Sequence, residues 1–128
     1  MIKRVLNIED TAIKHVTIVR ALNKVRIGLI DHATTGEQGI ELVEKSILEG
    51  KSYDLIITDM HFPIYDEIDS EAGMKVIAEL QKREINIPVV VCSSVRYGNL
   101  PGAVKCIYYN EKLANVDDEI RELIEEIG

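Results

Sequence analysis

Short continuous apolar runs alternate along this chain with stretches in which apolar residues recur at helical spacing. Short continuous runs are typical of strands buried on both faces, and stripes at intervals of three or four residues are typical of amphipathic helices. Their alternation favours a doubly wound α/β fold, in which a five-stranded parallel sheet is covered by helices on both sides. The predicted strands are residues 5–8, 25–30, 55–58, 89–92 and 106–109.

Helices are predicted between these strands and after the last one. The second helix begins at a capping box, Thr35-Gly36-Glu37-Gln38, and ends near Gly50. The last begins at Asn115. Between residues 93 and 105, glycine and proline leave room for only one or two helical turns. The predicted apolar faces are, in chain order, Ile13, Val16, Val19 and Leu22; Ile40, Val43 and Ile47; Gly73, Val76, Ile77 and Leu80; and Ile120, Leu123, Ile124 and Ile127.

Composition and charge narrow the functional classes. A length of 128 residues predicts one domain, residues 1–128, without an effector domain. The net charge of -7 argues against nonspecific binding to nucleic acid or anionic lipid. Cys92 and Cys106 lack disulfide-scaffold or metal-ligand spacing, so we expect buried free thiols. No signal peptide or membrane-spanning stretch is recognisable, which predicts a cytoplasmic location and no membrane partner.

Carboxylates follow two of the predicted strands. Glu9 and Asp10 come directly after the first strand, and Asp59 directly after the third. Parallel strands end at the same edge of a sheet, so three acids are expected to converge there. At about 4 Å such charges repel by roughly 1 to 4 kcal/mol, which raises the pKa of at least one of them. Mg²⁺ relieves this repulsion, because it binds one or two carboxylates together with waters and phosphate oxygens.

Further polar residues are predicted at the same edge. Ser93 and Ser94 follow the fourth strand, and the fifth ends at Tyr109 and Asn110. Open doubly wound sheets bind ligands there, and this set of groups suits a metal ion with one small oxyanion. The first strand is not followed by a glycine-rich phosphate loop, which argues against a nucleotide cofactor.

The sequence resembles the receiver domain of two-component response regulators of the chemotaxis-regulator type, along essentially its whole length. The resemblance is carried by Ile8-Glu9-Asp10 after the first strand, by Asp59-Met60 with Pro63 after the third, and by the run from Pro88 to Ser93. It implies a flavodoxin-like receiver fold with the strand order 2-1-3-4-5.

The resemblance also implies a role for each site residue. Asp59 would accept a phosphoryl group from a histidine kinase, a phosphotransfer protein or a small phosphodonor. Glu9, Asp10 and Asp59 would hold Mg²⁺ together with the backbone carbonyl of His61. Ser93 would hydrogen-bond a phosphoryl oxygen and draw its loop inward. A phosphoryl group adds nearly two charges and three acceptors, enough to shift a loop between two positions.

The chain departs from the receiver pattern at the end of the fifth strand. Receivers carry a lysine there followed by a proline, and this chain has Asn110 and Glu111. The cation that contacts the phosphoryl group in receivers is therefore missing from this position, and Lys112, two residues further on, is the alternative source of it. The aromatic switch position falls on Ile107, whose face of the strand Tyr109 shares.

A lengthened acidic loop is the other departure. Residues 64–72 carry Asp66, Glu67, Asp69 and Glu71. We expect this loop to be solvated surface, with shielding of the site as the alternative.

Three functions follow in order of preference. The first is a stand-alone phosphoacceptor switch at Asp59, not itself an enzyme, that signals to an unknown protein partner. The second is a pseudo-receiver, an interaction module that does not use phosphoryl chemistry. The third is a phosphohydrolase with an aspartate nucleophile, which usually has a second acid two residues later, where this chain has His61.

Overall fold

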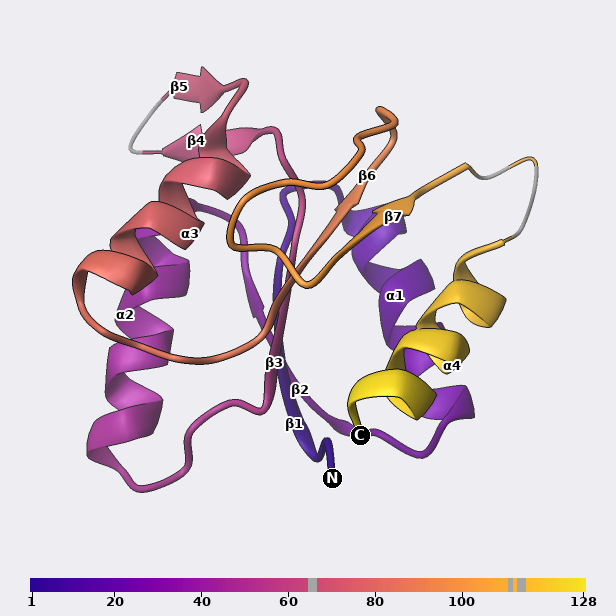
Figure 1. Cartoon of the computed structure of the whole chain (residues 1–128), viewed down its shortest axis with the longest axis horizontal. Coiled ribbons are helices and arrows are strands. Elements are labelled where there is room, and N and C mark those ends of the chain that lie inside the picture. Colours follow the sequence, from indigo (N-terminus) through magenta and orange to yellow (C-terminus); the bar gives the residue numbers. More distant parts are fainter. Residues whose placement is uncertain (65–66, 111, 113–114) are drawn as a thin grey trace.

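Five parallel strands form one sheet in the order β2-β1-β3-β6-β7 (Figure 1). The structure is a computed structural model, and it describes residues 1–64, 67–110, 112 and 115–128. The strands of the sheet are β1 (Arg4–Ile8), β2 (Leu29–Ala33), β3 (Leu55–Thr58), β6 (Val89–Ser93) and β7 (Lys105–Tyr108). Counted along the sheet strands alone, this is the order 2-1-3-4-5, so the predicted fold class is confirmed.

Helices cover both faces of the sheet, two on each side (Figure 1). They are α1 (Ala12–Lys24), α2 (Gly36–Leu48), α3 (Ala72–Lys82) and α4 (Val116–Ile127). Alternate residues of β1 serve the two cores: Leu6 and Ile8 pack with α2 and α3, and Val5 packs with α1 and α4. Each such fully buried aliphatic side chain contributes roughly 1.5 to 3 kcal/mol. The two cores hold the carboxyl ends of β1, β3 and β6 in one row.

The predicted apolar face of α1 is wrong at Ile13 and Val16 and correct at Leu22, which is buried. Ile13 is 68% exposed and Val16 is 44% exposed. A helix turns about 100° per residue, so Ile13 and Leu22, nine positions apart, lie on opposite faces. The residues that α1 buries are Lys14, Ile18, Ala21 and Leu22. The packed face therefore includes a lysine, at the turn nearest the carboxyl ends of the strands.

The second strand begins later than predicted. Residues 25–27 extend the end of α1, where the amides of Val25 and Ile27 donate to the carbonyl of Leu22. Arg26 has a φ of 65°, a left-handed conformation that stops the helix. Because these residues complete the helix terminus, β2 starts only at Leu29.

The helix starts and faces agree in part with the sequence. Thr35 caps α2, since its Oγ1 accepts the amide of Gln38 at 3.1 Å. Asn115 does not cap α4; its Nδ2 instead donates to the carbonyl of Tyr108 at 2.8 Å. The predicted faces of α2 and α4 are buried except near their C-terminal ends, where Ile47 is 44% exposed.

Two connections differ from prediction. The acidic segment contains a hairpin of β4 (Phe62–Ile64) and β5 (Glu67–Asp69), paired antiparallel. Asp66 and Glu111 lie outside the described residues. Between β6 and β7 the chain forms no helix at all (Figure 1). Pro101 disfavours helical backbone before it, and Gly102 has a φ of 84°, so this stretch runs as a loop over residues 94–104.

Candidate functional site

The predicted acids meet at the carboxyl ends of β1 and β3. Register pairs Ile8 with Thr58, so Glu9 and Asp59 both occupy the next position along their strands. The amide of Asp59 donates to the carbonyl of Ile8 at 3.0 Å. Carboxylate oxygens of Glu9, Asp10 and Asp59 all lie within 4.8 Å of one another. The convergence expected from the parallel-strand rule is therefore present.

The three acids differ in burial and in their contacts. Glu9 is fully buried, Asp10 is exposed, and Asp59 lies between the two. Glu9 Oε2 accepts the amide of Thr11 at 3.1 Å. Asp59 Oδ1 accepts the amide of Met60 at 2.7 Å. The site is therefore closed to solvent at Glu9 and accessible to solvent at Asp10.

Lys14, which the sequence analysis missed, reaches into the acidic site from α1. Its Nζ lies 3.0 Å from Glu9 Oε1 and 3.1 Å from Asp59 Oδ1. It also donates to the backbone carbonyl of Cys92 at 2.6 Å. Lys14 is only 6% exposed, and a buried charge is costly unless it is paired. No local signal in the sequence marks it, because apolar residues occur all round α1 and their spacing does not single out the packed face.

Burial dominates the electrostatics of this cluster. Desolvation raises the pKa of Glu9 to about 7; Lys14 lowers it and Asp59 raises it further. Burial works against the charge of Lys14, yet the pKa of its ammonium is raised, because Cys92, Glu9 and Asp59 surround it with negative potential. The carboxylates thus hold the lysine charged, while one of them is protonated more readily than usual.

The donor set fits a hard divalent cation. Glu9 Oε1 is buried, and within the described part of the chain it has no hydrogen-bond partner beyond its charged contact with the Lys14 ammonium at 3.0 Å. A buried oxygen with so few partners is costly. Three carboxylates with one exposed member offer oxygen ligands of the kind that Mg²⁺ and Mn²⁺ bind.

Ser93 and His61 lie at the carboxyl ends of the neighbouring strands β6 and β3. Ser93 ends β6, is 1% exposed, and its Oγ accepts the amide of Val95 at 3.2 Å. His61 follows Asp59 by two residues, and its Nε2 lies 3.3 Å from the Tyr97 hydroxyl. This contact joins loop 94–104 to the segment that follows Asp59, and the pKa of Tyr97 is raised by burial and then by the charge of Asp59.

The end of the fifth sheet strand places no lysine at the acids. Asn110 Oδ1 accepts the amide of Lys112 at 2.9 Å, and its Nδ2 lies 3.4 Å from the Tyr108 hydroxyl. Lys112 is exposed. Tyr109 is buried on the face that Ile107 shares, as predicted. The Lys14 ammonium lies 5.5 Å from the centre of the Tyr109 ring, so this strand contacts the site through an aromatic face.

A pair of histidines supports the first loop of the site and was also missed. His15 and His32 lie far apart in the sequence, yet their rings stack with centroids 3.6 Å apart. His32 Nε2 lies 2.7 Å from the carbonyl oxygen of Glu9. His15 Nδ1 lies 2.7 Å from Oδ1 of the buried Asn7. These contacts fix the backbone of Glu9 from the side of the edge strand.

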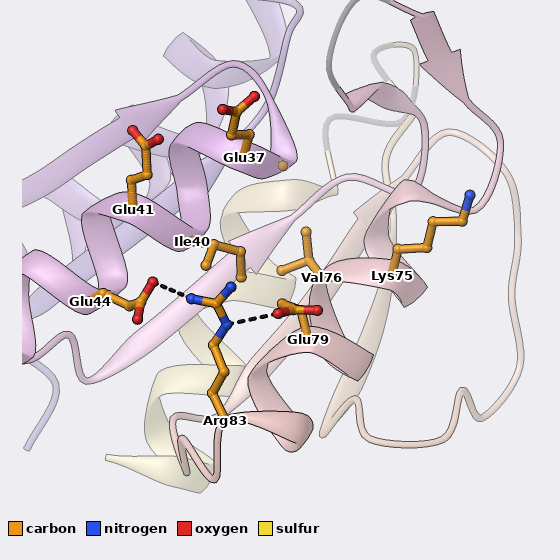
Figure 2. A pocket seen from close by; sticks show the side chains of 9 residues that line it. Glu37, Ile40, Glu41, Glu44, Lys75, Val76, Glu79 and Arg83 are labelled. Carbon is orange, nitrogen blue, oxygen red and sulfur yellow. Dashed lines mark hydrogen bonds and ion pairs between the residues drawn. The ribbon is translucent and has the colours of Figure 1, made fainter.

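A surface pocket of about 350 Å³ lies elsewhere, between α2 and α3 (Figure 2). Arg83 spans it: its guanidinium pairs with Glu44 on one side, and its Nε donates to Glu79 Oε1 at 2.8 Å on the other. Ion pairs exposed to this degree contribute little to stability, because solvent screens them. The pocket shares no lining residue with the acidic cluster.

Several solved structures of response regulators are similar to this one. The phosphorylated cyanobacterial phytochrome response regulator RcpA matches with a TM-score of 0.78 at 18% identity, over 99% of this chain and 94% of that one. The Mn²⁺-bound response regulator Rcp1 matches with a TM-score of 0.72 at 17% identity, over 94% and 91%. The response regulator domain of Thermotoga maritima CheB has a TM-score of 0.68 at 20% identity, over 99% and 96%.

Sequence comparison points the same way. Histidine protein kinase 1 of Candida albicans is 24% identical over 131 residues, which cover 98% of this chain. This chain spans 5% of the length of that relative. No model of a known protein family matches the chain. Together the comparisons confirm the receiver fold of response regulators, as the sequence motifs predicted.

None of the helices in the described part of the chain has the length and apolar character needed to cross a bilayer.

Proposed function

We propose that this chain is a receiver of two-component signalling in which Asp59 accepts a phosphoryl group in the presence of Mg²⁺. The observation that carries the proposal is the meeting of Glu9, Asp10 and Asp59 within 4.8 Å at the carboxyl edge of a receiver-type sheet. The Mn²⁺-bound and phosphorylated response regulators among the similar structures support both parts of it.

The chain's own groups suit the transfer step. Two donors hold Asp59 Oδ1, the amide of Met60 and the ammonium of Lys14, and these contacts leave Oδ2 to attack. Oδ2 uses a lone pair to form a bond to phosphorus. The bond between phosphorus and the donor oxygen breaks at the same time, and the electron pair of that bond leaves with the donor oxygen. A cation held by Glu9, Asp10, Asp59 and the His61 carbonyl would neutralise charge on the phosphoryl oxygens.

Ser93 links the phosphorylated state to the surface. Its Oγ accepts the Val95 amide, and its proton stays free to donate to a phosphoryl oxygen. That bond would draw the start of loop 94–104 toward the site. Because no helix lies between β6 and β7, the responding surface is made by loop 94–104, β7 and α4. The partners are a histidine kinase or phosphotransfer protein upstream and a protein that recognises this surface downstream.

A second function, the pseudo-receiver, is favoured by one observation. The Lys14 ammonium already lies against Glu9 and Asp59, so the chain supplies the acids with a cation of its own. In that function the same surface would bind a partner without any phosphoryl chemistry.

Phosphorylation with a small donor separates the candidates. The protein is incubated with Mg²⁺ and acetyl phosphate, and acyl phosphate is followed by intact mass and by its lability to hydroxylamine. We expect modification of the wild type and none of Asp59→Asn. Asp54→Asn is the matched control, because Asp54 lies at the opposite end of β3 and binds the amides of Lys3 and Arg4.

Each outcome assigns one function. Equal behaviour of wild type and Asp59→Asn rejects the phosphoacceptor and leaves the pseudo-receiver. Continuous turnover of many donor equivalents per protein, in place of a slowly decaying modification, indicates a hydrolase.

A further inference from the structure

In the described part of the chain, the end of the fifth sheet strand brings no cation to the acids, and α1 provides one. Asn110 follows β7, and Lys112 is exposed. The ammonium that lies 3.1 Å from Asp59 belongs instead to Lys14, one turn into α1. No expectation from the sequence assigned this residue a role.

We propose that Lys14 is the cation that binds the phosphoryl group on Asp59, and that its charge opposes the divalent cation held by the same acids. This inference rests on the proposed function, because it names how that site stabilises its product.

Three contacts fix the ammonium in place. It donates to the Cys92 carbonyl at 2.6 Å, and it lies within 3.1 Å of Glu9 Oε1 and Asp59 Oδ1. The ring of Tyr109 lies 5.5 Å away and covers it. An ammonium has three donors and no acceptor. The Cys92 bond can persist while a second N–H turns from Asp59 Oδ1 to a phosphoryl oxygen attached at Oδ2.

Charge balance explains why Lys14 and a metal can share the site. Glu9, Asp10 and Asp59 carry three negative charges when ionised, and Lys14 neutralises one of them. The two that remain match one divalent cation. Because the ammonium touches two of the three ligands, it nevertheless weakens the field that the metal experiences. Phosphorylation adds negative charge at Asp59, so the phosphoryl oxygens can bind the Lys14 ammonium and the divalent cation at the same time.

The position of Lys14 also couples the site to β6. Its bond to the Cys92 carbonyl lies one residue before Ser93, from which loop 94–104 departs. Lys14 from α1 and Ser93 from β6 would therefore both donate hydrogen bonds to the phosphoryl group. Movement of the ammonium toward a phosphoryl oxygen acts directly on the strand end that carries the switch hydroxyl.

The experiment compares Lys14→Met with Lys24→Met. Met keeps the length of the lysine stem, and Lys24 is a matched control on the same helix, 65% exposed and paired with Asp117. Mg²⁺ affinity is measured by calorimetry, and acyl phosphate is measured with acetyl phosphate at saturating Mg²⁺. Amide shifts induced by beryllofluoride report the response of loop 94–104.

Opposite changes are expected in the two measurements. Lys14→Met should bind Mg²⁺ about tenfold more tightly, because a neighbouring positive charge is gone. Its acyl phosphate should form at least about tenfold more slowly, because a charge-assisted bond to the phosphoryl group is lost. Lys24→Met should match the wild type in both. A residue that only stabilised the fold would not strengthen one property while weakening the other.

Two further variants keep the test decisive. Lys14→Gln can still donate to the Cys92 carbonyl, and it should reproduce both changes if Lys14→Met does not fold. Lys14→Met/Asn110→Lys should recover phosphorylation, because it returns a lysine to the end of β7.

The outcomes separate this inference from the function on which it rests. If the wild type forms no acyl phosphate at Asp59, the proposed function fails and the inference fails with it. If the wild type is phosphorylated and the neutral Lys14 variants are phosphorylated equally fast, the inference alone is overturned.

Discussion

The buried carboxyl of Glu9 makes the stability of the metal-free protein depend on pH in an unusual direction. Its pKa is raised from 4.5 to about 7 by burial, with Lys14 opposing and Asp59 adding to the rise. The folded state therefore binds more protons than the unfolded state between these two values. The unfolding free energy consequently falls as the pH rises through this window.

The size of the effect follows from the same two values. At about 1.4 kcal/mol for each tenfold change in an acid dissociation constant, the rise in the pKa of Glu9 corresponds to about 3 kcal/mol. Most of this contribution is present at pH 5 and lost by pH 8. Carboxylates that form favourable ion pairs give the opposite slope, so the direction identifies a buried acid without sufficient compensation.

Urea unfolding of wild type and Glu9→Gln measures the contribution of Glu9 to the pH dependence of the unfolding free energy. Other groups also titrate in this range; the pKa of His15, for example, is lowered by burial and by His32, and it gives stability that is lost as the pH falls. The difference between wild type and variant removes such shared contributions. In the presence of a chelator, we expect the wild type to lose about 2 to 3 kcal/mol of unfolding free energy relative to Glu9→Gln between pH 5 and pH 8.

Magnesium should reverse this loss. A ligand that binds only the folded state at a hundred times its Kd adds about 2.7 kcal/mol. At pH 8 Mg²⁺ should therefore stabilise the wild type and stabilise Glu9→Gln much less. The reasoning would be refuted if the two proteins differed by the same free energy at pH 5 and pH 8, or if Mg²⁺ stabilised both equally.

Two further predictions concern the scaffold of the site. In Gly73→Ala the added Cβ would lie 2.6 Å from the backbone oxygen of Asp59, so we expect the unfolding free energy to fall by about 1 to 3 kcal/mol and Mg²⁺ binding to weaken. The control is Gly28→Ala, whose added Cβ meets nothing within 4 Å. Equal stability of the two variants in thermal or urea unfolding would contradict the close contact. Burial raises the pKa of Cys92 to about 12, whereas Cys106 is only partly buried, so the prediction of two buried thiols is wrong for Cys106. A thiol reagent should therefore modify Cys106 in the native protein and Cys92 only on unfolding. Fast native labelling of both thiols would contradict the packing of β6.

The sequence alone determined the sheet and the acids at its edge. Leu55–Thr58 was predicted to the residue, because a continuous apolar run bounded by acids is a local pattern that a buried parallel strand requires. The meeting of Glu9 with Asp59 also followed from the sequence. Adjacent parallel strands end at the same edge of the sheet, so residues that follow two such strands in the sequence lie close together in the fold.

Local sequence did not predict the conformation of two connecting segments. The connection between β6 and β7 was expected to hold a helical turn and holds none, and the acidic segment after β3 pairs with itself as β4 and β5. Turn residues mark such segments as non-regular in the sequence. Which hydrogen bonds they then make depends on neighbours that are distant in the chain.

The environment of Lys14 was decided only by the tertiary structure. Apolar residues occur all round α1, so the periodicity of the helix did not single out the face that packs. The rotation of α1 on the sheet places Lys14 beside Asp59 and the Cys92 carbonyl, 78 residues away in the chain. Burying an ammonium is acceptable only where several strands deliver acceptors to one point. Local sequence determines the elements, and only their packing determines which charge faces which.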